Sequence, residues 1–136
     1  MTAKEYLQQI RKADIMINYK QQQLDELRSL ATSITSAMNP DKVQSSCVSD
    51  KVGDAVAKIV DLQNEINRDI DKLVDLKKEV MKVIDKLDAT SLELIYSRYF
   101  EFKTWEQIVC QMNYSCQWIW KLHGEALKKV SKLMKE

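Results

Sequence analysis

The chain has 136 residues, of which 30% are charged, yet its formal net charge is only +1. This length allows one or two small domains. Glycine (2 residues) and proline (1 residue) are rare, and no stretch sustains the alternating pattern of a strand, so the sequence predicts an all-α protein. No apolar run approaches the roughly 20 residues of a membrane span. Residues 1–87 hold 14 basic and 14 acidic residues, and residues 88–136 hold 7 and 6, which excludes a strongly basic bulk nucleic-acid binder.

The cysteines and the single histidine do not form a metal-binding pattern. Three cysteines occur, at positions 47, 110 and 116, without a CxxC motif or a Cys/His set. An odd number of cysteines suits a reducing cytoplasm. There is no glycine-rich phosphate loop and no nucleophile with a nearby histidine. We therefore expect a cytoplasmic protein that is not an enzyme and has no metal or other cofactor.

The first expected element is a helix over residues 2–38. Its apolar residues alternate spacings of three and four, as in a coiled-coil seam: Leu7, Ile10, Ile17, Leu24, Leu27, Ala31 and Ile34. Residues 39–49 begin with Asn-Pro and are rich in serine, which predicts a loop. Ser49 or Asp50 is expected to cap the helix that follows.

The second expected helix has the most regular pattern in the chain. One apolar row repeats every seven residues: Val52, Ile59, Ile66, Leu73, Val80 and Leu87. A second row lies four residues further on: Val56, Gln63, Ile70, Lys77 and Ile84. This repeat predicts a left-handed supercoil with a partner helix. The partner can be the first helix, in an antiparallel hairpin, or a second copy; we expect both, with a dimer seam at Val52, Ile59, Ile66, Leu73 and Val80. Gln63 and Lys77 would fix the register.

Residues 88–136 are expected to form a separate small domain after the helical segment 1–87. Asp88 or Thr90 can cap its first helix, and Phe102, in the link that follows, argues against a left-handed backbone there. Its predicted trihelical core consists of Leu94, Ile95, Tyr99, Phe100, Trp105, Ile108, Met112, Tyr114, Ile119, Leu122 and Leu127.

Residues 104–127 carry the signals of a helix, a tight turn and a second helix. Thr104 and Gln107 have the spacing of a capping box. Trp105, Ile108, Val109 and Met112 then share one helix face. Asn113 can end this helix in a left-handed conformation, and Ser115 can cap the next one. The second helix turns Ile119, Leu122 and Ala126 inward, and the whole predicts a helix-turn-helix.

These residues carry a family resemblance. The segment 87–130 resembles the fourth region of bacterial sigma factors, which binds the −35 promoter element in the major groove. The run 113–127 is similar to a family of uncharacterised phage and prophage proteins, and that resemblance covers essentially the whole chain. The resemblance to sigma factors implies base contacts from Cys116, Gln117 and Lys121. Contacts to the DNA backbone are expected from Thr104, Ser115, Trp120 and Lys128.

One departure from the sigma pattern bears on function. Sigma factors commonly place arginine near Cys116, Trp118 and Trp120, so the attraction to phosphates is weaker here. We expect a phage-type transcriptional regulator that binds double-stranded DNA in the host cytoplasm, as a homo-oligomer and with host RNA polymerase as a second partner. The alternatives are a protein-interaction module with a degenerate helix-turn-helix, and a DNA-packaging subunit that resembles a small terminase.

Several single residues have expected positions. Trp118 is expected in the core and Trp120 on the outside. His123 is expected to make a local hydrogen bond. Gly124 is expected to allow close approach of another helix, with close approach of DNA as the alternative. Cys110 is expected to be half buried, whereas Cys116 should be exposed.

Overall fold

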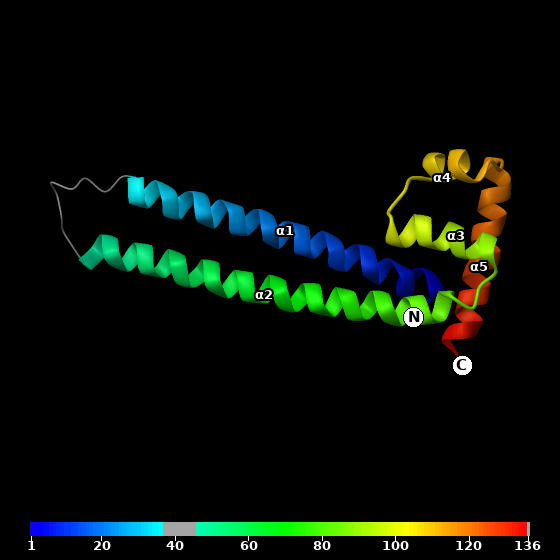
Figure 1. The fold of residues 1–136 in the computed structure, drawn as a ribbon, viewed down its shortest axis with the longest axis horizontal. Coiled ribbons are helices and arrows are strands. Elements are labelled where there is room, and N and C mark those ends of the chain that lie inside the picture. The colour runs from blue at the N-terminus through cyan, green and yellow to red at the C-terminus, as the bar shows by residue number, and fades with distance from the viewer. Residues whose placement is uncertain (37–45, 136) are drawn as a thin grey trace. The chain divides into compact units, whose positions relative to one another are not determined.

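The computed structural model describes residues 1–36 and 46–135, with the side chains of residues 1–33 and 50–135. Every element in this part of the chain is helical (Figure 1): α1 (Ala3–Ser36), α2 (Ser46–Ile84), α3 (Ala89–Ile95), the π-helical turn η2 (Tyr96–Phe100), α4 (Trp105–Met112) and α5 (Cys116–Met134). The prediction of an all-α protein is therefore confirmed. None of the described helices is both long and apolar enough to cross a membrane.

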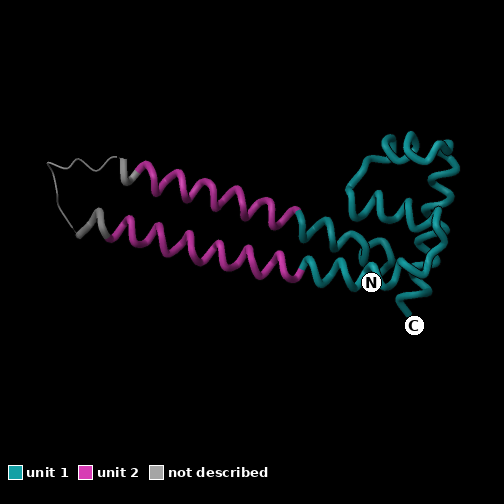
Figure 2. The backbone as a smooth tube through the Cα atoms, viewed as in Figure 1, with its two compact units in different colours: residues 1–14, 73–136 teal, residues 15–72 magenta. Residues whose placement is uncertain are grey.

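The chain divides into two compact units (Figure 2). Unit 1 combines residues 1–14 with residues 73–136, and unit 2 consists of residues 15–72. The boundary that we predicted between residues 87 and 88 falls inside unit 1, because both ends of the long helical segment group with the C-terminal helices.

Unit 2 is built from the second part of α1 and the first part of α2. Ile17, Leu24 and Ile66 are buried, as the heptad pattern predicted. The two segments are tied by Lys20, whose Nζ lies 2.8 Å from Glu65 Oε1 and 2.5 Å from Asp69 Oδ2. Hydrogen bonds to Asp69 and then Glu65 raise the pKa of Lys20. These are charge-assisted hydrogen bonds, which are stronger than neutral ones.

The first predicted row of α2 is confirmed over most of its length, but the second row is wrong. Ile66, Leu73, Val80 and Leu87 are buried, whereas Val52 and Ile59 are half buried. In the second row Val56 is 50% exposed and Ile70 is 38% exposed; only Ile84 is buried. The half-buried row lies one residue earlier: Ala55, Leu62, Asp69, Leu76 and Val83. The row was not predicted because it contains a charged residue, Asp69. The partner of Asp69 lies 49 residues away in α1, so the spacing within α2 could not indicate that this aspartate is half buried.

The polar residues expected to fix the register of α2 are also different. Gln63 is exposed and Lys77 is only half buried. The polar layer of unit 2 is formed instead by Lys20, Glu65 and Asp69.

The helix boundaries near the predicted loop also differ from expectation. Because α2 begins at Ser46, Ser49 and Asp50 lie inside the helix rather than capping it. Serine disfavours a helix only slightly, and no proline or glycine follows Pro40 until Gly53. The rest of the predicted loop, residues 39–45, lies outside the described residues, as do residues 37 and 38 at the end of the first predicted helix.

The start of α1 carries a capping box that the sequence analysis missed. The Glu5 N–H donates to Thr2 Oγ1 (3.1 Å), and the Thr2 N–H donates to Glu5 Oε2 (3.0 Å). The T-x-x-E spacing was the available signal.

Unit 1 has its centre among α3, α4 and α5. Leu94, Ile108 and Ile119, one from each of these helices, are fully buried together, and partly buried apolar residues pack around them: Trp105, Val109, Met112 and Leu122. Asp88 caps α3 by accepting from the Ser91 N–H (3.3 Å) and also binds Lys129 Nζ of α5 (2.9 Å). The predicted inward positions of Leu94, Ile95 and Tyr99 are confirmed.

The link between η2 and α4 contradicts the expectation for Phe102, whose φ is 57° and therefore left-handed. Local hydrogen bonds hold this turn: the Lys103 N–H donates to the Ser97 carbonyl (3.0 Å), and Arg98 Nη1 donates to the Lys103 carbonyl (2.9 Å). The Arg11 guanidinium lies 5.8 Å from the Phe102 ring. A left-handed conformation costs a bulky residue roughly 1–2 kcal/mol, so these contacts outweigh the local preference.

Candidate nucleic-acid interface

The segment from α4 to α5 is positioned by three local caps, all of them predicted. Thr104 and Gln107 form the capping box, with hydrogen bonds of 3.2 and 2.9 Å. Asn113 ends α4 with a φ of 58°, and Ser115 Oγ accepts from the Trp118 N–H (3.2 Å) at the start of α5. Only residues 113–115 separate the two helices, so their relative orientation is set by a short, hydrogen-bonded turn.

The two sides of α5 differ in burial as expected. Ile119, His123, Ala126 and Val130 are buried, and Leu122 and Leu127 are half buried. All the residues predicted to contact DNA are exposed: Thr104, Ser115, Cys116, Gln117, Trp120, Lys121 and Lys128. We call the exposed row Gln117, Trp120, Lys121, Gly124 and Lys128 the outer face of α5. Its members are three or four residues apart and therefore neighbours on the helix surface.

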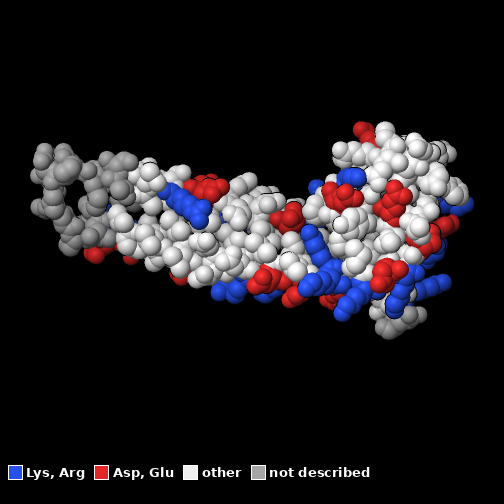
Figure 3. Space-filling view, viewed as in Figure 1, with Lys and Arg blue, Asp and Glu red and all other residues white. Residues whose placement is uncertain are grey.

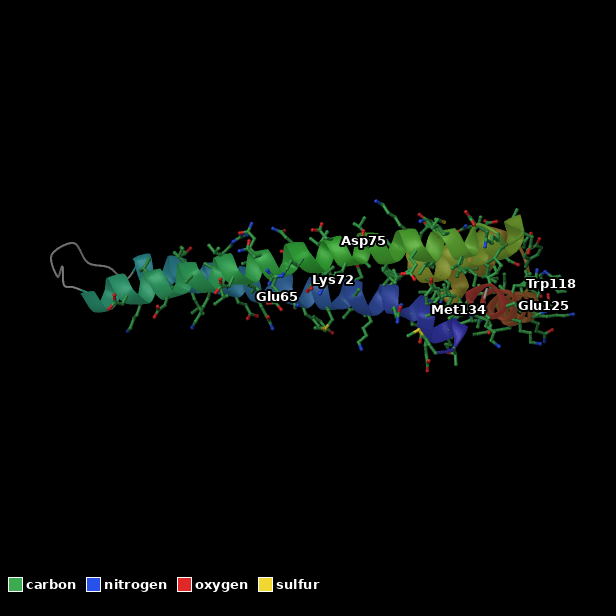
Figure 4. The ribbon with its side chains drawn as sticks, turned by 90° about the horizontal axis from the view of Figure 1, so that it is seen from below. Glu65, Lys72, Asp75, Trp118, Glu125 and Met134 are labelled. Carbon is green, nitrogen blue, oxygen red and sulfur yellow. The ribbon has the colours of Figure 1, made fainter. Side chains whose placement is uncertain are left out.

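Two aromatic residues expected in the core are exposed instead. Trp118 is 46% exposed and Tyr114 is 40% exposed, and their rings meet edge to face at 6.4 Å. Lys121 Nζ lies 5.4 Å from the Trp118 ring. Tyr114 falls in the turn, beyond the last residue of α4, and Trp118 lies about 100° around the helix from Ile119. Figure 4 labels Trp118 and Glu125, which both belong to α5.

Among the described side chains, Cys110 and Cys116 are exposed cysteines. Cys116 is where we expected it, but the expectation that Cys110 is half buried is wrong. Ile108, two residues before Cys110, is the residue of α4 that is buried in the core of unit 1.

Trp120 is 55% exposed, which agrees with its predicted outward position. One side of its ring packs on Trp105 of α4, with centroids 4.7 Å apart. Trp105 is itself covered by the Arg98 guanidinium at 4.5 Å and by the edge of the His123 ring at 4.7 Å. Trp120 is thus an exposed indole supported from behind by packed groups, which lowers the entropy lost on binding.

His123 makes a hydrogen bond, as expected, but its partner is Tyr99, which is not local in the sequence. The Tyr99 Oη and His123 Nε2 are 2.8 Å apart, and both residues are buried. Burial lowers the pKa of His123 to about 4, with further contributions from Lys4 and Arg98, so the imidazole is neutral at pH 7. Burial likewise raises the pKa of Tyr99. The sequence offered no signal for this pair, because the two residues are 24 positions apart.

Gly124 lies open to solvent in α5. Apart from its two chain neighbours and the backbone of its own helix, no described atom lies within 4 Å of the position that a Cβ would take. The expectation that another helix of this chain approaches Gly124 closely is therefore wrong for the described residues. Gly53 in α2 has equally open surroundings.

Positive charge on α5 is concentrated in its second half. The helix contains four lysines and one glutamate. Lys129 is paired with Asp88, whereas Lys128 has no ion-pair partner among the described residues. Figure 3 shows basic side chains gathering toward the C-terminal part of α5, while the surface over α4 is largely uncharged. This distribution differs from the arginine-rich first turns of sigma factors.

Metal sites and ligand cavities are the other kinds of site that the described residues could form. In residues 1–36 and 46–135 no group of three His, Cys, Asp or Glu could hold a metal ion. A hollow of about 260 Å³ in unit 2 is lined by Leu27, Leu30, Lys51, Asp54, Ala55 and Lys58. This is smaller than most small-molecule sites. No protein-family model, curated protein or solved structure matches this chain.

Proposed function

We propose that the chain is a phage-type transcriptional regulator that contacts double-stranded DNA through the outer face of α5. The observation that carries this proposal is the exposure of Gln117 and Lys121 on a helix whose opposite side is buried in unit 1. A helix presented in this way can enter the major groove without unfolding its own domain. The resemblance of residues 87–130 to the fourth region of sigma factors supports the same arrangement.

Each exposed residue has a role that fits its chemistry. Gln117 can donate to and accept from adenine in the major groove, and Lys121 can donate to guanine. The hydroxyl groups of Thr104 and Ser115 suit phosphate contacts, which position the protein but carry no sequence information. Trp120 and Lys128 would contact the backbone beside them. Cys116, at the first turn, offers only a weak donor and a small apolar contact.

A protein-interaction module is the second candidate, and the exposed aromatic residues favour it. Tyr114, Trp118 and Trp120 are each at least 40% exposed, and they belong to the residue types that dominate protein interfaces. In that case a partner protein would cover Trp118 and Trp120. Host RNA polymerase is one candidate for this partner. DNA affinity would then be low at every salt concentration.

We propose that the protein forms a dimer. Part of the dimer seam predicted from the sequence is, however, already buried within a single chain. Ile66, Leu73 and Val80 are buried in the single chain. The apolar residues left for a second copy in unit 2 include Val56 (50% exposed) and Val60 (48% exposed). Two copies would place two α5 helices on repeated half-sites, with a spacing set by the dimer.

The test is selection from a random pool of duplex DNA with the purified protein at moderate salt. We expect an enriched motif that Gln117→Ala and Lys121→Ala each degrade. Matched controls are Gln22→Ala and Lys72→Ala, which remove the same exposed side-chain types from unit 2. If no motif is enriched, or if the controls degrade it as strongly as the α5 variants, the proposal that Gln117 and Lys121 contact bases is wrong.

A further inference from the structure

Gly124 costs the folded chain stability without an internal reason. Glycine in the interior of a helix makes the helix less stable than alanine does. Gly124 lies near the middle of the 19-residue helix α5, and its φ is not positive. A Cβ at this position would meet nothing within 4 Å in the described chain. Neither the backbone conformation nor the packing of the described residues therefore requires glycine at this position.

The neighbours of Gly124 on the outer face of α5 are exposed side chains one helical turn away. Trp120 and Lys121 lie one turn before Gly124, and Lys128 lies one turn after it, all of them exposed. Trp120 is held in place by Trp105, and Lys128 has no ion-pair partner among the residues described. We call the space over Gly124, bounded by Trp120, Lys121 and Lys128, the Gly124 notch.

The charges around the notch suit a polyanion better than a second helix. Lysine and glutamate are depleted from the cores of protein interfaces, and the notch has two lysines on its border with Glu125 beside it. Lysine ammonium groups are common phosphate ligands, and phosphate contacts provide most non-specific DNA affinity. A position without a side chain lets a sugar–phosphate backbone come close to the helix.

We propose that the Gly124 notch holds the sugar–phosphate backbone of duplex DNA, with Lys128 bound to a phosphate and Trp120 packed against the adjoining sugar. This inference rests on the proposed function and specifies where the DNA backbone crosses α5. Glu125 limits the affinity, because its carboxylate lies next to the phosphate path.

The test measures the affinity of the full chain for a labelled duplex from the random pool, and for an enriched duplex where selection gives one. We expect Gly124→Ala to weaken binding about threefold and Gly124→Leu at least tenfold on both duplexes, because phosphate contacts carry no sequence information. Glu125→Gln should tighten binding to both. Lys128→Gln should reduce the slope of log Kd against log salt by about one.

Gly53 provides the matched control, since it is the other open glycine within a long helix. Gly53→Ala and Gly53→Leu should leave the affinity unchanged, and circular dichroism will show that all four variants remain helical. If the wild-type chain binds duplex DNA and Gly124→Leu binds it equally well, the proposal that the Gly124 notch holds the DNA backbone is wrong, whereas the proposed function is not contradicted. A Gly124 variant that changes only the oligomer mass also overturns the notch in favour of a second copy. If the wild-type chain binds no duplex, both proposals fail together.

Discussion

The buried imidazole of His123 gives a prediction that can be worked out in detail. Its pKa in the folded chain is about 4, against 6.5 for an unperturbed histidine, chiefly because burial disfavours the charged form. As the pH falls, the unfolded chain binds the proton first. The stability that depends on neutral His123 is therefore complete above about pH 6.5 and is lost progressively between about pH 6.5 and pH 4.

The magnitude follows from the gap between the two pKa values. A gap of about 2.5 pH units corresponds to about 3 kcal/mol once both forms have titrated. Between pH 7 and pH 5 the free energy of unfolding should fall by about 2 kcal/mol from this residue. Urea unfolding followed by tryptophan fluorescence will measure this change, because Trp105 packs against His123.

Two variants and one spectrum separate this cause from others. His123→Gln cannot titrate but can still hydrogen-bond to Tyr99, so its stability should change much less between pH 7 and pH 5. Tyr99→Phe removes the 2.8 Å hydrogen bond and should keep the pH dependence, because the imidazole stays buried. The chain has one histidine, so its proton NMR signal is unambiguous. A signal that titrates near pH 6.5 in the folded protein would refute the reasoning.

Three further predictions concern stability. Lys129 and then Ser91 lower the pKa of Asp88 to about 2, so the stability that depends on its carboxylate is present above about pH 4 and is lost as the pH falls toward 2. Measured by urea unfolding, Asp88→Asn should therefore cost at most about 1 kcal/mol at pH 7 and little at pH 2. At Phe102, the glycine variant should be about 1 kcal/mol more stable than the alanine variant, since only glycine relieves the left-handed backbone; equal melting temperatures would contradict this. In a double-mutant cycle, Lys20→Ala should couple more strongly to Asp69→Ala than to Glu65→Ala, because the Asp69 side chain is 24% exposed and the Glu65 side chain 47%; stronger coupling to Glu65 would contradict the geometry of unit 2.

The sequence alone determined the helical class and the ends of the C-terminal helices. The caps formed by Thr104 and Ser115, together with the left-handed stop at Asn113, occur where spacing predicted them, and Asp88 is the one of the two predicted residues that caps α3. Each of these signals is a hydrogen bond or a backbone preference within about three residues of chain. Such signals need no knowledge of the rest of the fold, which is why they could be predicted.

Tertiary structure decided the features that depend on distant partners. Position 69 joins the half-buried row of α2 because Lys20 of α1 neutralises its charge, and sequence periodicity alone could not place an aspartate there. Phe102 takes a left-handed backbone because hydrogen bonds from Lys103 and Arg98 close the turn around it.

The candidate interface shows the same division. The outward positions of Gln117 and Lys121 follow from the apolar spacing of α5, so the sequence was sufficient. The exposure of Trp118 and the pairing of Tyr99 with His123 depend on how α3, η2, α4 and α5 pack. Helical periodicity fixes the angle of a side chain around its own axis, but only packing decides whether another element covers it.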